Sequence, residues 1–318
     1  MSVDDTFQQE CMALGRAARA AGFRRDEKMP KAYRDAYRHC QVERRVKPAL
    51  LEKKLLYLRI SAVKRGLIVD PTVSTEVLRA IMGRVCPVSL VSFRNDGSRA
   101  GTASIDRLVN DGTYAPGNLV ALSRRVNEIK GERGFEEVLE IASEGQDAEG
   151  LLSGEWARLA SLMYAPWCSA KGLEDPLILP FSTLPPPHSL STTSQLMQWI
   201  LLRAATSPTW PDAIKVFRAV TNVGEFGYER FDGFATRLRQ AAMNRKHLPS
   251  VWLDEEELFN TFVDWYIASR PAIYELLSHS HKQNLTGVDL GSMVRNWQLP
   301  SRSNSGSDSA IEIRVFSK

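Results

Sequence analysis

The residues with the clearest chemical potential lie in one stretch of the chain, Ala103–Gly131. Asp106 offers a carboxylate and Asn127 offers an amide oxygen, and both are hard ligands of the kind that Mg²⁺ prefers. Arg107, beside the carboxylate, could hold a phosphate through two hydrogen bonds. Its guanidinium stays protonated at any working pH, so it cannot take a proton from water. Because phosphodiester hydrolysis needs a divalent cation and donors that orient the substrate, this stretch could support that chemistry.

The pattern of apolar residues predicts how these side chains are positioned. An alternating run over 103–109 is followed by the turn-forming residues 110–113 and by a second short apolar run over 118–122. That order is typical of a β-hairpin. From Ser123 the apolar spacing becomes helical. We therefore expect a strand, a second strand and a helix in succession.

This arrangement resembles the HNH, or ββα-metal, endonuclease family. Members carry Asp-His on the first strand, an Asn that opens the second strand, and an Asn or His on the helix with a Lys close behind. The matching residues here are Asp106 with Arg107, Asn118, and Asn127 with Lys130, and Asn118 and Asn127 are nine positions apart. The resemblance covers roughly 45 of the 318 residues.

The resemblance implies a role for each matching residue. Asp106 and Asn127 would bind Mg²⁺ or Mn²⁺, and Asn118 would brace the hairpin loop through side-chain to backbone hydrogen bonds. Arg107 stands where the family has its general base, a histidine. None of the five histidines lies inside the motif. The same Asp-Arg variant occurs in phage and mobile-element sequences that resemble the family.

Nucleic acid would be contacted by the cationic side chains of the motif, which are Arg107, Arg124, Arg125 and Lys130. Each candidate also has an ordinary structural explanation. Asp106 and Arg107 could form a surface ion pair, and Asn118 could be a turn residue. Asn127 could lie on a solvated helix face.

Charge and cysteine content narrow the class of protein. Residues 79–133 hold nine Lys and Arg against five Asp and Glu, whereas residues 134–180 hold two against nine. A basic excess around the motif suits a phosphate-binding surface. The four cysteines are widely separated, and Cys86 stands alone where many family members have a Cys-x-x-Cys zinc knuckle, so we expect no structural zinc and no disulfide framework. With no apolar run of membrane-spanning length, a cytoplasmic protein without membrane contact is the expectation.

Helices are expected on the amino-terminal side of the motif, over 6–23, 49–66 and 73–82. The helix over 49–66 is amphipathic, with several lysines and arginines opposite its apolar stripe. In the basic stretch Arg24–Arg45, Tyr33 and Tyr37 alternate with arginines. They could stack on bases or belong to an ordinary amphipathic helix.

On the carboxyl-terminal side we expect two short helices, over 134–143 and 155–164, and then a Pro-rich linker. Residues 192–298 are predicted to be all-helical, with large aromatic residues in the core. The expected helices there cover 194–205, 211–220, 229–244, 254–278 with a bend at Pro271, and 288–297.

The predicted fold class is α+β, mostly α, with a small ββα finger at about 103–131 embedded in helices and followed by an all-helical domain. The predicted domains are a basic helical region (1–82), the finger with its flanking helix (83–150), the linker (151–190), the helical domain (191–298) and a mostly disordered tail (299–318). The leading functional hypothesis is a metal-dependent DNA endonuclease of a phage or mobile element. The alternatives are an inactive, nuclease-derived DNA-binding protein and a helical module that binds a protein partner through the carboxyl-terminal domain.

Overall fold

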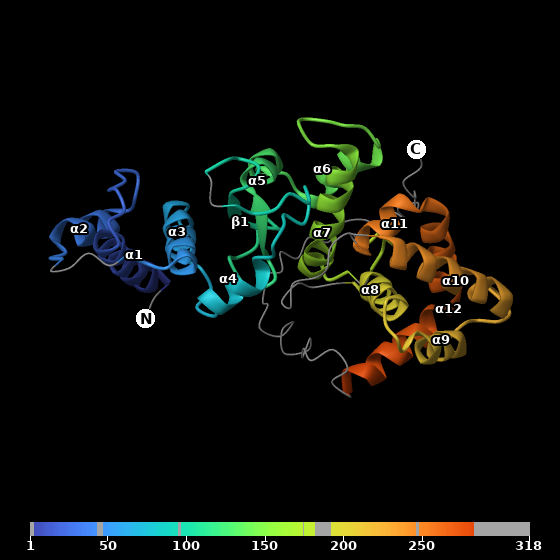
Figure 1. Cartoon of the computed structure of the whole chain (residues 1–318). Coiled ribbons are helices and arrows are strands. Elements are labelled where there is room, and N and C mark those ends of the chain that lie inside the picture. Colours follow the sequence, from blue (N-terminus) through green and yellow to red (C-terminus); the bar gives the residue numbers. More distant parts are fainter. Residues whose placement is uncertain are drawn as a thin grey trace. The chain divides into compact units, whose positions relative to one another are not determined.

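The computed structural model describes residues 3–42, 47–94, 97–173, 175–181, 192–245 and 248–282. The described chain is mostly α-helical and contains one two-stranded antiparallel sheet (Figure 1), which confirms the predicted fold class. It forms two compact units, one of residues 1–86 and 91–124 and the other of residues 87–90 and 125 onward.

The first unit begins with a helical hairpin. Helices α1 (Val3–Ala20) and α2 (Lys31–His39) pack on each other around a small apolar core. Tyr33 and Tyr37 both lie in that core, and the hydroxyl of Tyr37 donates to the carbonyl of Phe23 at 2.7 Å. Burial raises the pKa of Tyr33 to about 12. These two rings therefore hold the helices together and do not present a stacking surface for bases.

Gly15 marks the closest approach of the two helices. A Cβ atom at this position would lie 2.3 Å from the carbonyl oxygen of Tyr33 and 3.0 Å from the backbone nitrogen of Tyr37. Only glycine allows backbones to approach this closely.

Helices α3 (Leu50–Lys64) and α4 (Thr75–Ile81) form a second apolar core of this unit. The expected stripe of α3 is confirmed, because Leu58 and Ala62 are buried there with Leu51 and Leu55 packed beside them. Tyr114 and Leu119 of the hairpin region belong to the same core. The stripe of α3 thus supports the hairpin directly.

The hairpin consists of β1 (Ala103–Arg107) and β2 (Leu119–Ser123), paired antiparallel with Ala103 opposite Ser123 and Arg107 opposite Leu119. All five residues of β2 are buried. Helix α5 (Arg124–Lys130) follows without a break, so the predicted strand, strand and helix are confirmed. The boundary between the two units falls between Arg124 and Arg125, at the start of this helix.

Helices α6 (Phe135–Ser143) and α7 (Ser153–Lys171) open the main part of the second unit. Helix α7 is longer than predicted, because it passes through Pro166 without ending. A proline inside a helix costs about 3 kcal/mol. Burial of aromatic side chains offsets this cost, since the ring of Phe135 lies 5.5 Å from that of Tyr164 and 4.7 Å from that of Trp167.

The prediction of a Pro-rich linker over 151–190 is therefore wrong for its first part, because Ser153–Lys171 form the long helix α7. Residues 175–181 also differ from a solvated linker, because Leu177, Leu179 and Phe181 are buried. The compact units divide at α5 and not in this passage.

The remaining described helices pack around one large apolar core. They are α8 (Thr193–Ala205), α9 (Trp210–Ala219), α10 (Tyr228–Asn244), the 3₁₀ turn η1 (Leu248–Ser250), α11 (Val251–Asp254) and α12 (Glu256–Lys282). As predicted, the aromatic residues form this core, with Trp252, Phe262 and Trp265 nearly inaccessible to solvent. Helix α12 includes Pro271. The expected helix over 288–297 and the tail from 299 lie outside the described residues.

A buried carboxylate, Asp175, connects the helices α7, α8 and α12. Its oxygens accept hydrogen bonds from the backbone nitrogen of Ser194 at 2.7 Å, from the hydroxyl of Ser194 at 3.0 Å, and from the hydroxyl of Tyr164 at 3.1 Å. The hydroxyl of Tyr266 donates to it at 3.4 Å. Burial, and next the negative charge of Asp175, raise the pKa of both tyrosines. We call these four residues the Asp175 cluster.

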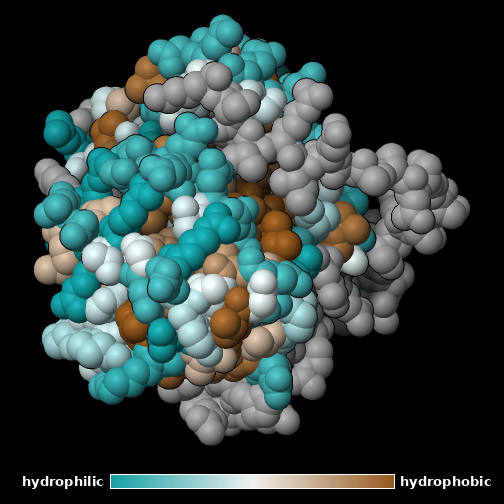
Figure 2. Space-filling view, turned by 90° about the vertical axis from the view of Figure 1, so that its right-hand side faces the viewer, coloured by the Kyte–Doolittle hydropathy of each residue, from teal (hydrophilic) through white to brown (hydrophobic). Residues whose placement is uncertain are grey.

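Among the described residues visible in Figure 2, hydrophobic side chains form separate patches between hydrophilic ones. Among the described residues, no helix is both long enough and apolar enough to cross a membrane.

Candidate active site

The candidate site begins with Asp106, in the middle of β1 and opposite Val120 of β2. Alternate residues of a strand point to opposite faces, so Asp106 and Ser104 share one face, while Ile105 and Arg107 share the other. Ile105 packs against the core formed by α3 and α4. The side chain of Asp106 is half-buried, and it lies on the face of β1 opposite to that core.

Asn118 braces the loop between the strands, as the sequence predicts. It is completely buried. Its Oδ1 accepts from the backbone nitrogen of Val109 at 2.8 Å, and its Nδ2 donates to the carbonyls of Val109 at 3.0 Å and Thr113 at 2.9 Å. One side chain thus satisfies three backbone groups of the loop, which fixes the end of β1 relative to the start of β2.

Arg107 has a structural role that sequence reasoning did not foresee. Its side chain is buried, and its guanidinium donates to the carbonyl of Gly112 at 3.0 Å and lies 4.5 Å from the centre of the Tyr114 ring. The hydroxyl of Tyr114 in turn accepts from Arg65, the residue that follows α3, at 2.9 Å. A clamp on phosphate would require the guanidinium to leave these contacts, so Arg107 primarily holds the loop between the strands in place.

Helix α5 carries the other predicted residues. Arg125 forms an ion pair with the buried Glu155 and donates to the carbonyl of Gly150 at 2.6 Å. Lys130 is completely buried, so its ammonium does not lie at the surface where a nucleic acid would bind. Arg124 is exposed and Asn127 is half-buried. Among the predicted cationic contacts to nucleic acid, Arg124 is the one that the structure leaves at the surface.

Asp106 and Asn127 belong to different compact units, because β1 lies in the first and α5 from Arg125 onward lies in the second. Within the part of the chain that the structure describes, no group of three or more His, Cys, Asp or Glu side chains could hold a metal ion. A magnesium site with one protein carboxylate would still be chemically reasonable, since Mg²⁺ retains water ligands and takes substrate phosphate oxygens. The half-buried carboxylate of Asp106 fits that requirement.

Two supporting residues were missed at the sequence level. Lys54 of α3 is half-buried, and its ammonium donates to the carbonyl of Ala103 at 2.7 Å; burial lowers its pKa. The sulfur of Cys86 accepts from the backbone nitrogen of Ser123 at 3.2 Å. They hold the first residue of β1 and the last residue of β2. Because each contact joins positions far apart in the chain, no local spacing could have revealed it.

Among the side chains that the structure describes, no histidine takes the place of the missing general base. His39 is the only histidine whose side chain the structure describes, and it lies at the end of α2, where Nδ1 is 2.8 Å from the carbonyl oxygen of Asp35.

Comparison of the chain with protein-family models, with curated proteins and with solved structures found no match. The resemblance to the HNH family therefore stands on the residues of the finger and on its observed order of elements.

Proposed function

We propose that the chain is a metal-dependent endonuclease of the HNH-like kind, acting on DNA. The observation that carries the proposal is the hairpin and helix themselves. Asp106 lies half-buried on the first strand, and Asn118 opens the second strand and braces the loop. These positions agree with the family pattern.

In this proposal Asp106 supplies an oxygen ligand to Mg²⁺ or Mn²⁺, and Asn127 is the second protein ligand that the resemblance implies. The cation, when bound, stabilises negative charge on the phosphate. Asn118 and Arg107 keep β1 and its loop in place. Arg124, exposed at the start of α5, can meet a backbone phosphate.

The direct test is nicking of supercoiled plasmid DNA by the purified full chain with Mg²⁺ or Mn²⁺. We expect Asp106→Ala to lower the rate by about a hundredfold or more, because a charge-stabilising group is lost. Asp111→Ala is the matched control, since it removes an exposed carboxylate from the same hairpin. Absence of nicking by the unmodified protein, or equal nicking by Asp106→Ala, would refute the proposal.

A second candidate is a DNA-binding protein that has lost cleavage. The position of Arg107 favours it, because a buried arginine engaged with Gly112 stands where a base is needed. This candidate predicts binding without nicking, and binding that weakens steeply between about 50 and 200 mM salt as counterions are released. Binding that is independent of salt would argue against it.

A further inference from the structure

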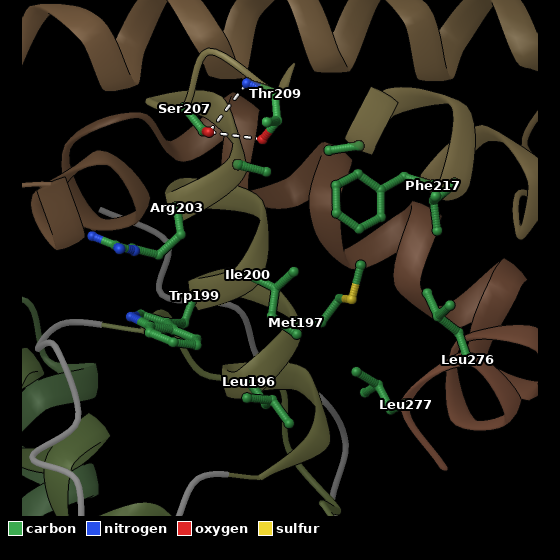
Figure 3. Close-up of a pocket in the computed structure, with 13 residues that line it drawn as sticks. Leu196, Met197, Trp199, Ile200, Arg203, Ser207, Thr209, Phe217, Leu276 and Leu277 are labelled. Carbon is green, nitrogen blue, oxygen red and sulfur yellow. Dashed lines mark hydrogen bonds between the residues drawn. The ribbon is translucent and has the colours of Figure 1, made fainter. Parts of the chain in front are cut away.

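The second unit contains a cavity that the proposed nuclease activity does not use. It has a volume of about 510 Å³ and is lined by residues of α8, α9, α12 and the α8–α9 turn (Figure 3). Most of the lining is apolar, as shown by Met197, Ile200, Phe217, Leu276 and Leu277. Cavities of about 300–1,000 Å³ with such a lining are typical binding sites for small molecules, and they often lie between helices.

The polar groups of the lining are few. The hydroxyls of Ser207 and Thr209 lie 2.7 Å apart, and the backbone nitrogen of Thr209 donates to the hydroxyl of Ser207 at 3.2 Å, so these groups satisfy each other (Figure 3). Arg203 is the only charged residue among the described lining side chains, and it is exposed. Its guanidinium makes no hydrogen bond or ion pair with another residue in the described part of the chain.

The arrangement of Arg203 places a positive charge at the edge of the apolar cavity. Arg203 and Trp199 project from the same side of α8, while Ile200 and Met197 lie toward Phe217 and the end of α12 (Figure 3). Because the lining residues that the structure describes include one cation and no carboxylate, a negatively charged group would be favoured beside Arg203. The apolar part of the same molecule would fill the space between the helices and remove apolar surface from water.

We propose that this cavity binds a small amphipathic anion, that is, an apolar chain or ring of small-molecule size with one carboxylate. Val216, which is 46% exposed, lies in the lining and gives the ligand a route from solvent. Such binding is independent of the finger and of nuclease activity.

The experiment uses the full chain and three probes that share a twelve-carbon tail: dodecanoate, dodecanol and dodecyltrimethylammonium. Isothermal titration should give saturable binding of dodecanoate at one site. We expect dodecanoate to bind about fivefold more tightly than dodecanol, a difference typical of one partly exposed charge pair, and the cation to bind more weakly than both.

Two sets of variants locate the site. Val216→Glu should weaken dodecanoate binding and Val216→Lys should preserve or strengthen it, while both leave the fold intact because position 216 is exposed. Arg203→Gln should abolish the preference for dodecanoate over dodecanol. Lys215→Gln is the control, since it removes a cation of α9 that is paired with Asp212 and does not line the cavity.

Three results would overturn the proposal. They are no saturable binding of dodecanoate, equal binding of all three probes, and equal binding by Val216→Glu and Val216→Lys. A chain that ends at Lys282 provides a further test. Dodecanoate binding that appears only after this truncation would mean that a segment of the chain itself fills the cavity.

Discussion

The hairpin loop and the Asp175 cluster both bury polar side chains, but they join different parts of the chain. Asn118 bonds to backbone groups of Val109 and Thr113, only nine and five positions away. Asp175 joins Tyr164, Ser194 and Tyr266, and the last of these lies 91 positions away. The first arrangement shapes one loop beside a half-buried carboxylate, whereas the second fixes helices to one another. Buried polar side chains thus shape a loop beside the candidate site in one unit and hold helices together in the other.

The largest effect should come from Asp175→Ala. This change leaves the buried backbone nitrogen of Ser194 without its acceptor and removes one partner of the Tyr164 hydroxyl, which still donates to the carbonyl of Leu177. We expect the second unit to lose about 3–5 kcal/mol in its free energy of unfolding. Denaturant unfolding followed by tryptophan fluorescence measures it. Asp147→Ala is the control, because Asp147 is exposed and accepts from the backbone nitrogen of Ser153. Equal losses of free energy of unfolding in the two variants would show that the buried Asp175 cluster stabilises the fold no more than an exposed carboxylate does.

Asn118→Ala should have the next largest effect. It leaves three partly buried backbone groups of the loop without the partner that Asn118 provides, at a cost of about 3 kcal/mol, and this loss should fall on the first unit. Hydrogen exchange of the amide of Val109 should also become much faster. Thr113→Ala removes an exposed side chain and keeps the carbonyl that Asn118 uses, so it should change neither quantity. Unchanged protection of Val109 in Asn118→Ala would contradict the bracing role.

Arg107→Gln separates the loop role of this residue from a phosphate role. Loss of the contact with the Tyr114 ring and of the bond to Gly112 should lower stability by about 1–2 kcal/mol. Arg65→Gln, which loses only the bond to the hydroxyl of Tyr114, should cost less. If Arg107→Gln weakens DNA binding severalfold while the unfolding midpoint stays constant, the residue contacts phosphate and the anchoring role is wrong.

The smallest effect is expected at the surface, for the pair of Lys64 and Asp26. The hydrogen bond from the Lys64 ammonium, 2.6 Å away, and one from the backbone nitrogen of Lys28 hold the pKa of Asp26 below its usual value. The stabilisation is therefore present above the unfolded pKa of about 4 and disappears as pH falls through the lower folded pKa. The free energies of unfolding of the unmodified chain and of Asp26→Asn should differ slightly at pH 6 and become equal near pH 2. If the difference in the free energy of unfolding between the two proteins grows as the pH falls, the pKa of Asp26 is not lowered in the folded chain.

The same contrast explains what the sequence could predict. The hairpin, α5 and the bracing by Asn118 follow from residue types at short spacing, and α3 follows from its apolar stripe. The roles of Lys54 and Cys86 depend on partners 49 and 37 positions away, which spacing alone cannot show. For the same reason the Asp175 cluster was missed. Helix α7 was predicted too short, because Pro166 is a local signal to stop and the aromatic packing that overrides it is not local.

The crossing of α1 and α2 at Gly15 has a consequence for natural and laboratory variation. With only 2.3 Å available between a Cβ and the carbonyl oxygen of Tyr33, even alanine, the mildest replacement, would push the two helices apart. Hydrogen is the largest substituent that this crossing admits. A saturation library of the chain should therefore return glycine alone at position 15, while the exposed faces of the same two helices accept many residues.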